Sequence, residues 1–411
     1  MKNRILLLIA TMAFTLSSFA VSAETDRTWY LAGEAMTVSV TADSALIAYA
    51  ELCDTHGLAA SVVISLKEGK GTGVVELPSD LHSGYYLLSV YTRDNAQVSQ
   101  SLVAVVNPLR KSKDDDIEWV EITSSDSLSY TATESEVRGC GGTGVREMSA
   151  AEVFVHETEG QIIKARVRNV YDGHTFEGSQ ICPSLSVVGK QIHYFEGKMV
   201  DDTLAVFYTY GISGKHPIVL SAIASGVSLP IEMISPFRTM LPNRLPHLVF
   251  HYQRREVEDR SLDMQRRMKA IIPEKTLDYD NTVFGTKPDL SYNLDEYRQF
   301  LTIREVLLEY VFCVMKKKIN GVTQLFVRRE MDHFNSSLPT LVLIDGMPAN
   351  DIEQLLNYDA RRIHYINIYG GQYTFGRDIY NGILSFVTRS GRLTNYPTGR
   401  NTQYLEYKFP Q

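Results

Sequence analysis

The amino-acid sequence predicts a mainly β, multidomain fold: immunoglobulin-like β-sandwiches followed by a small α+β domain. Two observations lead to this fold class. Short runs rich in β-branched and aromatic residues recur along the chain, separated by Gly, Asp, Ser or Pro, and this pattern is typical of antiparallel sandwiches. The chain has 411 residues, 44% of them hydrophobic, which is enough for about two or three domains with their own cores.

The first residues have the features of an export signal. Basic residues precede an apolar run over residues 5–19, and the small residues of Val21-Ser22-Ala23 follow it, as in a cleaved signal peptide. We therefore assign residues 1–23 to a signal peptide and expect a mature chain from about Glu24. Because no cysteine follows the run before Cys53, we expect no lipoprotein anchor. The expected location is the periplasm or the outer membrane, as an associated protein.

The charge of the chain excludes some partner classes. The formal net charge is −7, and it becomes −9 without Lys2 and Arg4, which argues against binding to nucleic acid or to anionic lipid. After the signal peptide, no segment approaches the roughly 18 uncharged apolar residues that a membrane helix needs. We expect no membrane-spanning segment in the mature chain.

Residues 24–108 predict the first sandwich. Met36, Val38 and Val40 alternate with threonine and serine, which is the period of a half-buried strand. Further strands are predicted over these segments: 46–52, 61–66, 73–77, 85–92 and 102–106.

This region resembles the macroglobulin-type immunoglobulin-like domain of bacterial envelope proteins. The resemblance rests on WYLAGEAMTVSV, AYAELCDTHG, GKGTGVVELPSDLHSGYYLLSVYTR and VNP, which lie between residues 29 and 108. None of the four cysteines begins the Cys-x-x-Gln pattern that the internal thioester of a macroglobulin would need. We therefore expect no covalent trapping of proteases.

Residues 109–150 are polar and charged and predict a linker or an extended hairpin. Asp114, Asp115 and Asp116 raise the alternative of a calcium loop. The ligand spacing and the central glycine of such a loop are absent, so a solvated linker is favoured.

Residues 151–235 predict a second β-sandwich. The segments GQIIKARV, FEGKMVDDTLAVFYTYG and HPIVLSA are loosely similar to the carboxypeptidase-regulatory-like module that accompanies macroglobulin-type domains. Residues 236–293 break the β pattern, and a partly amphipathic helix that ends before Pro273 is predicted there. We expect this helical and extended connector to pack across domains.

Residues 294–411 predict the α+β domain. Thr302 and Glu305 form a capping-box pattern, with Leu301 and Val306 placed as a hydrophobic staple. A hairpin turning at Asn320-Gly321 follows. Then we expect these elements: strands over 340–344, 363–369 and 382–388, and a short helix over 351–356.

The last quarter of the chain resembles the plug domain of TonB-dependent outer-membrane receptors. The motif consists of these residues: Ile344-Asp345-Gly346 with Pro348, Ile352, the run 363–368, Phe375-Gly376, Asn381-Gly382-Ile383 and Thr388-Arg389-Ser390-Gly391. It gives the candidate site, structural or partner-binding: Asp345, Gly346, Pro348, Gly376, Asn381 and Gly382. A receptor barrel needs about 22 strands of roughly ten residues, but only 20 residues follow Gly391. A TonB-interacting box is also missing near Glu24. The resemblance therefore implies a fold and a neighbourhood without transport by this chain.

Asp345 is interpreted as a turn residue. Its side chain can accept backbone N–H bonds, Gly346 allows unusual backbone angles, and Pro348 stops further strand pairing. A catalytic carboxylate would need a partner acid, base or metal ligand, and the neighbouring sequence offers none at a suitable spacing.

We predict no catalytic, cofactor or metal site. Residues 139–144 spell GxGxxG, but no buried strand precedes them and no acidic residue follows about 20 positions later. His247 and His251, four apart on a predicted strand, would lie about 13 Å apart, too far to share an ion. The cysteines fit no zinc spacing, and only Cys140 with Cys182 is a candidate disulfide.

The function predicted from these patterns is non-enzymatic binding or scaffolding of another envelope protein, in an outer-membrane (TonB-dependent) uptake or assembly system. Two alternatives stay open. The chain is a small-ligand or glycan-binding protein that uses aromatic residues of the second sandwich, or a hydrolase whose site is assembled from residues distant in sequence.

Overall fold

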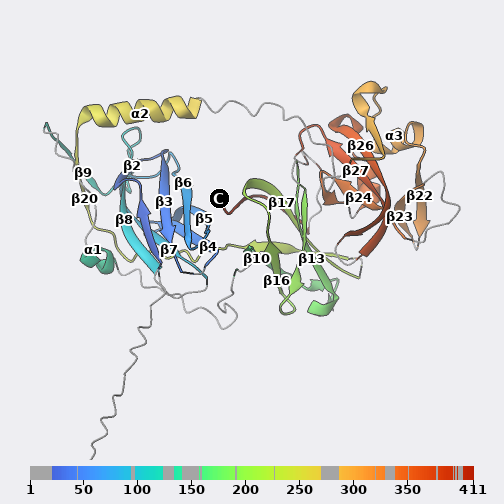
Figure 1. Ribbon diagram of the computed structural model, residues 1–411, viewed down its shortest axis with the longest axis horizontal. Coiled ribbons are helices and arrows are strands. Elements are labelled where there is room, and N and C mark those ends of the chain that lie inside the picture. Colours follow the sequence, from blue (N-terminus) through green and yellow to red (C-terminus); the bar gives the residue numbers. More distant parts are fainter. Residues whose placement is uncertain are drawn as a thin grey trace, which may run out of the picture. The chain divides into compact units, whose positions relative to one another are not determined.

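A computed structural model describes most of the chain (Figure 1). The described residues are 21–43, 45–93, 98–123, 134–140, 157, 160–189, 192–225, 227–269, 287–319, 321–328, 338–349, 351–375, 378–391, 393, 396 and 401–411. The chain divides into two compact units. The first unit comprises residues 1–158 and 239–253, and the second unit comprises residues 159–238 and 254–411.

The first unit contains the predicted immunoglobulin-like sandwich. Its sheets have the strand orders β1-β3-β6 and β2-β8-β7-β4-β5. The strands are β1 (Ser22–Thr25), β2 (Trp29–Leu31), β3 (Ala35–Thr41), β4 (Ile47–Cys53), β5 (Leu58–Ser65), β6 (Lys70–Glu76), β7 (Gly84–Tyr91) and β8 (Val98–Val106). All the predicted strands are present, with ends that differ by a few residues. β1 begins two residues ahead of Glu24, the expected start of the mature chain.

The core of this sandwich follows the predicted alternation. Met36, Val38 and Val40 are buried in one cluster with Tyr30 and Tyr86, while the intervening side chains of β3 are more exposed. β4 is buried at every position, because its second face is also covered. On that face the carboxylate of Glu51 accepts hydrogen bonds from the backbone N–H groups of Thr239 (2.9 Å) and Met240 (2.8 Å).

The segment predicted as a polar linker contains regular structure. β9 (Ile117–Glu121) pairs in parallel with β20 (Leu248–Tyr252), and α1 (Glu134–Gly139) follows β9. Trp119 packs edge-on against Phe250, with ring centroids 5.3 Å apart. The linker prediction is therefore wrong for Ile117–Glu121. The partner strand lies more than a hundred residues later, so local composition gave no sign of the pairing.

The second unit begins with the second predicted sandwich. Its sheets have the orders β15-β16-β10-β19 and β14-β13-β17-β18, and β28 also pairs with β17. The elements are β10 (Gln161–Val167), β11 (Val170–Tyr171), β12 (His174–Thr175), η1 (Gly178–Gln180), β13 (Ile181–Val187), β14 (His193–Glu196), β15 (Lys198–Met199), β16 (Leu204–Thr209), β17 (Gly214–Ala224), β18 (Val227–Leu229), β19 (Ile231–Ile234) and β28 (Gln403–Phe409).

β28 crosses the predicted domain boundary. It pairs antiparallel with β17 from Gly214↔Phe409 to Leu220↔Gln403, and Tyr407 and Phe409 are buried in the core of the second sandwich. The end of the predicted 294–411 domain therefore completes the sheet of the preceding domain. The helix predicted in residues 236–293 is present as α2 (Arg254–Lys269). The prediction that this segment breaks the β pattern is wrong for Leu248–Tyr252, which form β20 and pair with β9.

Residues 290–391 of the second unit are called here the C-terminal domain. Its sheet has the order β21-β26-β27-β24-β25, beside the hairpin β22-β23. The elements are β21 (Leu290–Asn293), η2 (Leu294–Glu296), α3 (Ile303–Glu309), β22 (Val314–Ile319), β23 (Val322–Val327), β24 (Leu341–Ile344), β25 (Met347–Pro348), α4 (Ile352–Leu356), η3 (Ala360–Arg362), β26 (Ile363–Phe375) and β27 (Asp378–Thr388).

Local signals position α3 as predicted, with one exception. The Thr302 side chain accepts from the N–H of Glu305, and the Glu305 carboxylate accepts from the N–H of Thr302. This reciprocal pair is the predicted capping box. The staple prediction is wrong, because Leu301 is 64% exposed and does not cover Val306.

β24 is buried on both faces, by different parts of the second unit. Val342 and Ile344 lie in a core cluster with residues of α3 and α4. Leu341 and Leu343 lie in another cluster, against Ile192 and Tyr194 of the second sandwich. A strand covered on both sides has a continuous apolar sequence. The C-terminal domain is therefore packed onto the second sandwich through β24.

All four cysteines are free, so the candidate disulfide between Cys140 and Cys182 is not formed. The buried Cys140 Sγ donates to the carbonyl of Glu136 at 3.2 Å, and Cys182 is exposed on β13. Among the described residues, no helix is long and apolar enough to cross a membrane.

Candidate functional site

Asp345, the residue on which the catalytic and architectural readings differ, is a buried carboxylate at the end of β24. It is 1% exposed and has a left-handed backbone, with φ of 47°. Its side chain accepts hydrogen bonds from the N–H of Thr388 (2.7 Å), the hydroxyl of Thr388 (2.5 Å) and the N–H of Leu393 (3.0 Å). Both carboxylate oxygens therefore hold the end of β27 and the segment after it.

Gly346 follows with φ of 86°, a conformation that side chains disfavour. A Cβ at this position would lie 2.5 Å from Cγ2 of Ile192. A glycine is therefore required at position 346 for two reasons. Its φ is unfavourable for other residues, and the second sandwich lies too close to leave room for a Cβ. Pro348 ends β25 opposite Leu343. The prediction that it stops the pairing is wrong, because the N–H of Ala349 still donates to the carbonyl of Val342 at 2.9 Å.

Asn381 and Gly382 lie at the other end of the β24–β27 pair. The N–H of Asn381 donates to the carbonyl of Pro339 (2.8 Å), and its carbonyl accepts from the Thr340 hydroxyl (2.9 Å). Gly382 has φ of 82° beside a bulge in β26. Gly376 lies outside the described residues.

The structure therefore does not gather the motif residues into one cluster. Asp345 fixes the end of β24, and Asn381 fixes its beginning, so the two are separated by the length of the strand. Within the described part of the chain, no group of three His, Cys, Asp or Glu side chains is placed to hold a metal ion. The arrangement of the motif serves to clamp a parallel strand pair at both ends.

A charged network lies at the same end of the sheet as Asp345. The Asp295 carboxylate pairs with Arg389 at 2.6 Å and with His364 at 3.2 Å. The hydrogen bond from Arg389 is the main cause that lowers the pKa of Asp295 below its usual value of 3.8. These exposed groups join η2 to the end of β27.

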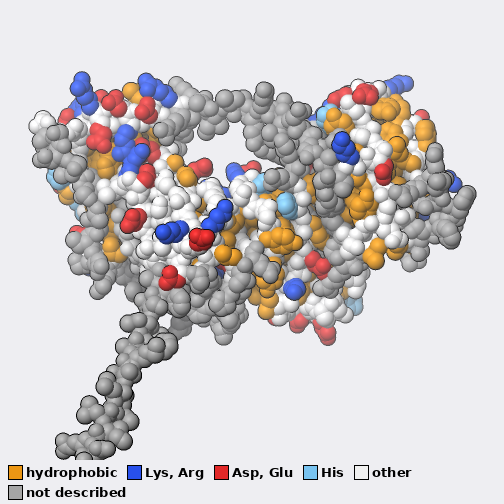
Figure 2. Space-filling model, viewed as in Figure 1, with side chains coloured by type: hydrophobic (Ala, Val, Ile, Leu, Met, Phe, Trp, Pro, Cys, Tyr) orange, Lys and Arg blue, Asp and Glu red, His pale blue; other side chains and the backbone are white. Residues whose placement is uncertain are grey.

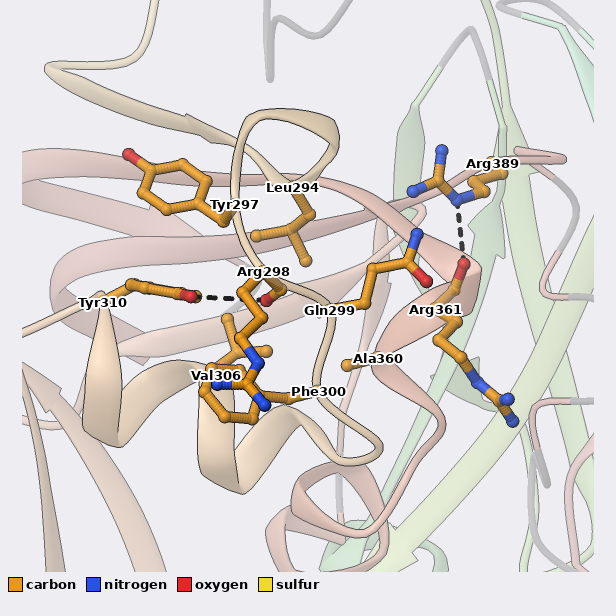
Figure 3. A pocket seen from close by; sticks show the side chains of 10 residues that line it. All are labelled: Leu294, Tyr297, Arg298, Gln299, Phe300, Val306, Tyr310, Ala360, Arg361 and Arg389. Atoms are coloured by element: carbon orange, nitrogen blue, oxygen red, sulfur yellow. Dashed lines mark hydrogen bonds between the residues drawn. The ribbon is translucent and has the colours of Figure 1, made fainter.

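A small hollow next to this network is shown in Figure 3. It lies between the turn after η2 and α3, and Arg298, Arg361 and Arg389 surround it. Two hydrogen bonds join residues that line it, from the Tyr310 hydroxyl to the carbonyl of Arg298 (3.3 Å) and from Arg389 Nε to the carbonyl of Arg361 (2.8 Å). Its volume is ≈ 10 Å³, which is room for about one water molecule.

Sequence reasoning missed the most exposed apolar residues of this domain. Leu308 and Phe312 are 72% and 78% exposed, and Leu301 is nearby in sequence. They precede β22, whose Lys316, Lys317 and Lys318 are exposed. Figure 2 shows hydrophobic side chains at the surface over the part of the molecule that Figure 1 labels α3 and β22. Three consecutive lysines, Lys316 to Lys318, were the sequence signal for an exposed surface at this place. The sequence around them predicted only a hairpin.

Comparisons with known proteins give only distant likenesses. No protein-family profile and no curated protein matches the chain. A similar solved structure is that of Escherichia coli alpha-2-macroglobulin activated by porcine elastase, at 12% identity and a TM-score of 0.20, over 55% of this chain and 20% of that chain. Another is the BSP domain of a biofilm associated protein, at 11% identity and a TM-score of 0.18, over 55% and 30%.

A third similar structure is that of an Escherichia coli adhesin, at 11% identity and a TM-score of 0.19, over 53% of this chain and 65% of that chain. The chain spans 30% or less of the length of the first two neighbours. At these values the likenesses carry no argument about function. The multidomain β architecture stands on the strands and sheets of the chain itself.

Proposed function

We propose that this chain is a non-enzymatic protein of the bacterial cell envelope that binds another envelope protein through its C-terminal domain. The proposal includes an association with an outer-membrane, TonB-dependent uptake or assembly system, which rests on the plug-like motif. The observation that carries it is the exposure of Leu301, Leu308 and Phe312, which lie in or next to α3, together with the exposed lysines of β22. These residues are called here the α3–β22 face.

Asp345 and Gly346 of the motif make contacts within the fold, so other side chains would have to recognise a partner. Asp345 receives three hydrogen bonds from Thr388 and Leu393, and Gly346 is in contact with Ile192. Residues committed to such contacts are poorly placed to meet a partner. A partner would meet the surface side chains that the fold leaves uncovered.

The α3–β22 face has two properties of a docking surface. Leu301, Leu308 and Phe312 each leave more than three-fifths of their surface exposed, and exposed apolar surface of this kind is typical of interaction sites. Among the described strands, β22 pairs only with β23. Its other edge is therefore available to an added strand from a partner.

Charge defines the kind of segment that fits. Three consecutive lysines lie on β22 of a chain whose net charge is −7. Lysines on an edge strand also discourage self-association. An extended acidic segment of another protein would neutralise them and pair with the free edge, so we assign the partner an acidic, extended segment.

The experiment is affinity recovery and crosslinking from native envelopes with the full chain. The test variant carries Phe312→Ser and Lys318→Glu, and the matched control carries Val200→Ser and Lys113→Glu at exposed positions elsewhere. Point variants are needed because removing residues 293–411 would also remove β28 from the second sandwich.

We expect a defined outer-membrane protein to be recovered by the wild type and by the control, and to be lost with the test variant. Recovery of the same protein by all three chains would refute the α3–β22 face as the binding surface. Recovery of no defined partner by the wild type would refute the partner hypothesis itself.

A further inference from the structure

The second sandwich carries an open concavity on a different surface. It has a volume of ≈ 470 Å³, within the range of small-molecule sites. The residues that line it include Tyr171, Asp172, His174, Phe176, Gln180 and Val227. They come from the β11–β12 hairpin, the end of η1 and β18.

The hairpin that forms one wall has a well-defined geometry. Asp172 and Gly173 have φ of 47° and 77°, so both central residues of the turn are left-handed, as in a type I′ turn. At the base, the N–H of Phe176 donates to the carbonyl of Asn169 (2.8 Å), and Asn169 Nδ2 donates to the carbonyl of Phe176 (3.2 Å). Tyr171 and His174 are direct cross-strand partners, which fixes their spacing.

The lining combines aromatic surface with available polar groups. The Tyr171 side chain is 48% exposed and Phe176 is half-buried. The side chains of Tyr171, Asp172 and His174 make no hydrogen bond to any other described residue. A carboxylate that accepts, an imidazole that donates and accepts, and a phenol are thus free to meet a ligand.

We propose that this concavity binds an uncharged saccharide. The apolar C–H face of a pyranose ring packs on an aromatic ring, while its hydroxyl groups need both donors and acceptors around them. Asp172 opposes an anionic ligand. An organic cation would use only the carboxylate and the aromatic rings and would leave His174 and Gln180 unused, so the full lining favours a saccharide.

The proposal is independent of partner binding, because the concavity shares no residue with the α3–β22 face. It is tested by saturation-transfer difference NMR on the full chain with glucose, galactose and N-acetylglucosamine, and with tetramethylammonium as the cationic probe. The full chain is required since β28 completes this sandwich.

We expect saturable binding of at least one of the three sugars, weakened about tenfold or more by Tyr171→Ala and by His174→Ala. Tyr208→Ala changes a comparably exposed tyrosine on β16 of the same sandwich and should leave binding unchanged. Because Tyr171 and His174 are exposed, both variants should keep the wild-type unfolding midpoint. Binding of none of the sugars, binding of tetramethylammonium alone, or equal losses with Tyr208→Ala would overturn the proposal.

Discussion

Gly346 of the C-terminal domain lies against Ile192 of the second sandwich so closely that a Cβ on the glycine would sit 2.5 Å from Ile192 Cγ2. The N–H of Gly189 also donates to the carbonyl of Asp345 at 3.1 Å. The backbone of the C-terminal domain therefore approaches the second sandwich so closely that position 346 has no room for a side chain. This contact joins the C-terminal domain to the second sandwich.

The first prediction concerns this contact. Gly346→Ala should lower the free energy of unfolding by about 2–4 kcal/mol. The new Cβ would be strained at a φ of 86° and would also clash with Ile192. Gly321→Ala is the matched control: its φ is 83°, but no atom lies within 4 Å of the added Cβ. It should cost about 1 kcal/mol. Equal losses in urea denaturation of the two variants would contradict the role of the Ile192 contact.

Asp345 should matter for stability. Asp345→Asn replaces one acceptor oxygen by an NH₂ group that faces the donors of Thr388 or Leu393. We expect a loss of about 2–4 kcal/mol in the free energy of unfolding. Asp351→Asn keeps an N-cap at α4 and should be nearly neutral. A fully stable Asp345→Asn protein that no longer recovers its partner would instead indicate direct participation in binding.

The last strand should stabilise the second sandwich. Phe409 is fully buried in its core, so Phe409→Ala should cost about 3–5 kcal/mol. Tyr404 lies on the same strand but is 40% exposed, and Tyr404→Ala should cost about 1 kcal/mol or less. Thermal and urea unfolding of both variants provide the measurement. A small effect of Phe409→Ala would mean that β28 adds little to the sheet in solution.

The second sandwich should lose stability in mild acid. Burial, and then the charge of His216, lower the pKa of His193 below 6.5. The folded state therefore disfavours protonated His193, so its contribution is present above pH 6.5 and is lost as the pH falls through the lowered pKa. His193→Phe should show a smaller drop in urea midpoint between pH 7.5 and about 5.5 than the wild type.

An NMR titration gives a sharper check of the same group. His216→Asn should raise the pKa of His193 but leave it below 6.5, since burial is the larger cause. A His193 pKa at or above 6.5 in the wild type would show that the ring is better hydrated than its position on β14 indicates.

Local sequence predicted much of the fold. The alternation of Met36, Val38 and Val40, the capping box of Thr302 and Glu305, and the β22–β23 hairpin involve neighbours along the chain. Their energetics depend on period and turn chemistry, which are readable without the rest of the molecule. The sequence predicted which residues make up the candidate site. It did not predict that Asp345 and Asn381 lie at opposite ends of β24.

Local sequence was enough to predict a mainly β, multidomain protein and the turn at Asp345, because both depend on side-chain periodicity or on backbone angles at nearby residues. Tertiary structure alone decided that Ile117–Glu121 pairs with Leu248–Tyr252, that Gln403–Phe409 joins β17, and that Leu308 and Phe312 stay exposed. Strand pairing across more than a hundred residues depends on which edges and faces remain free after the local elements have packed. That information belongs to the whole fold, and no window of sequence contains it.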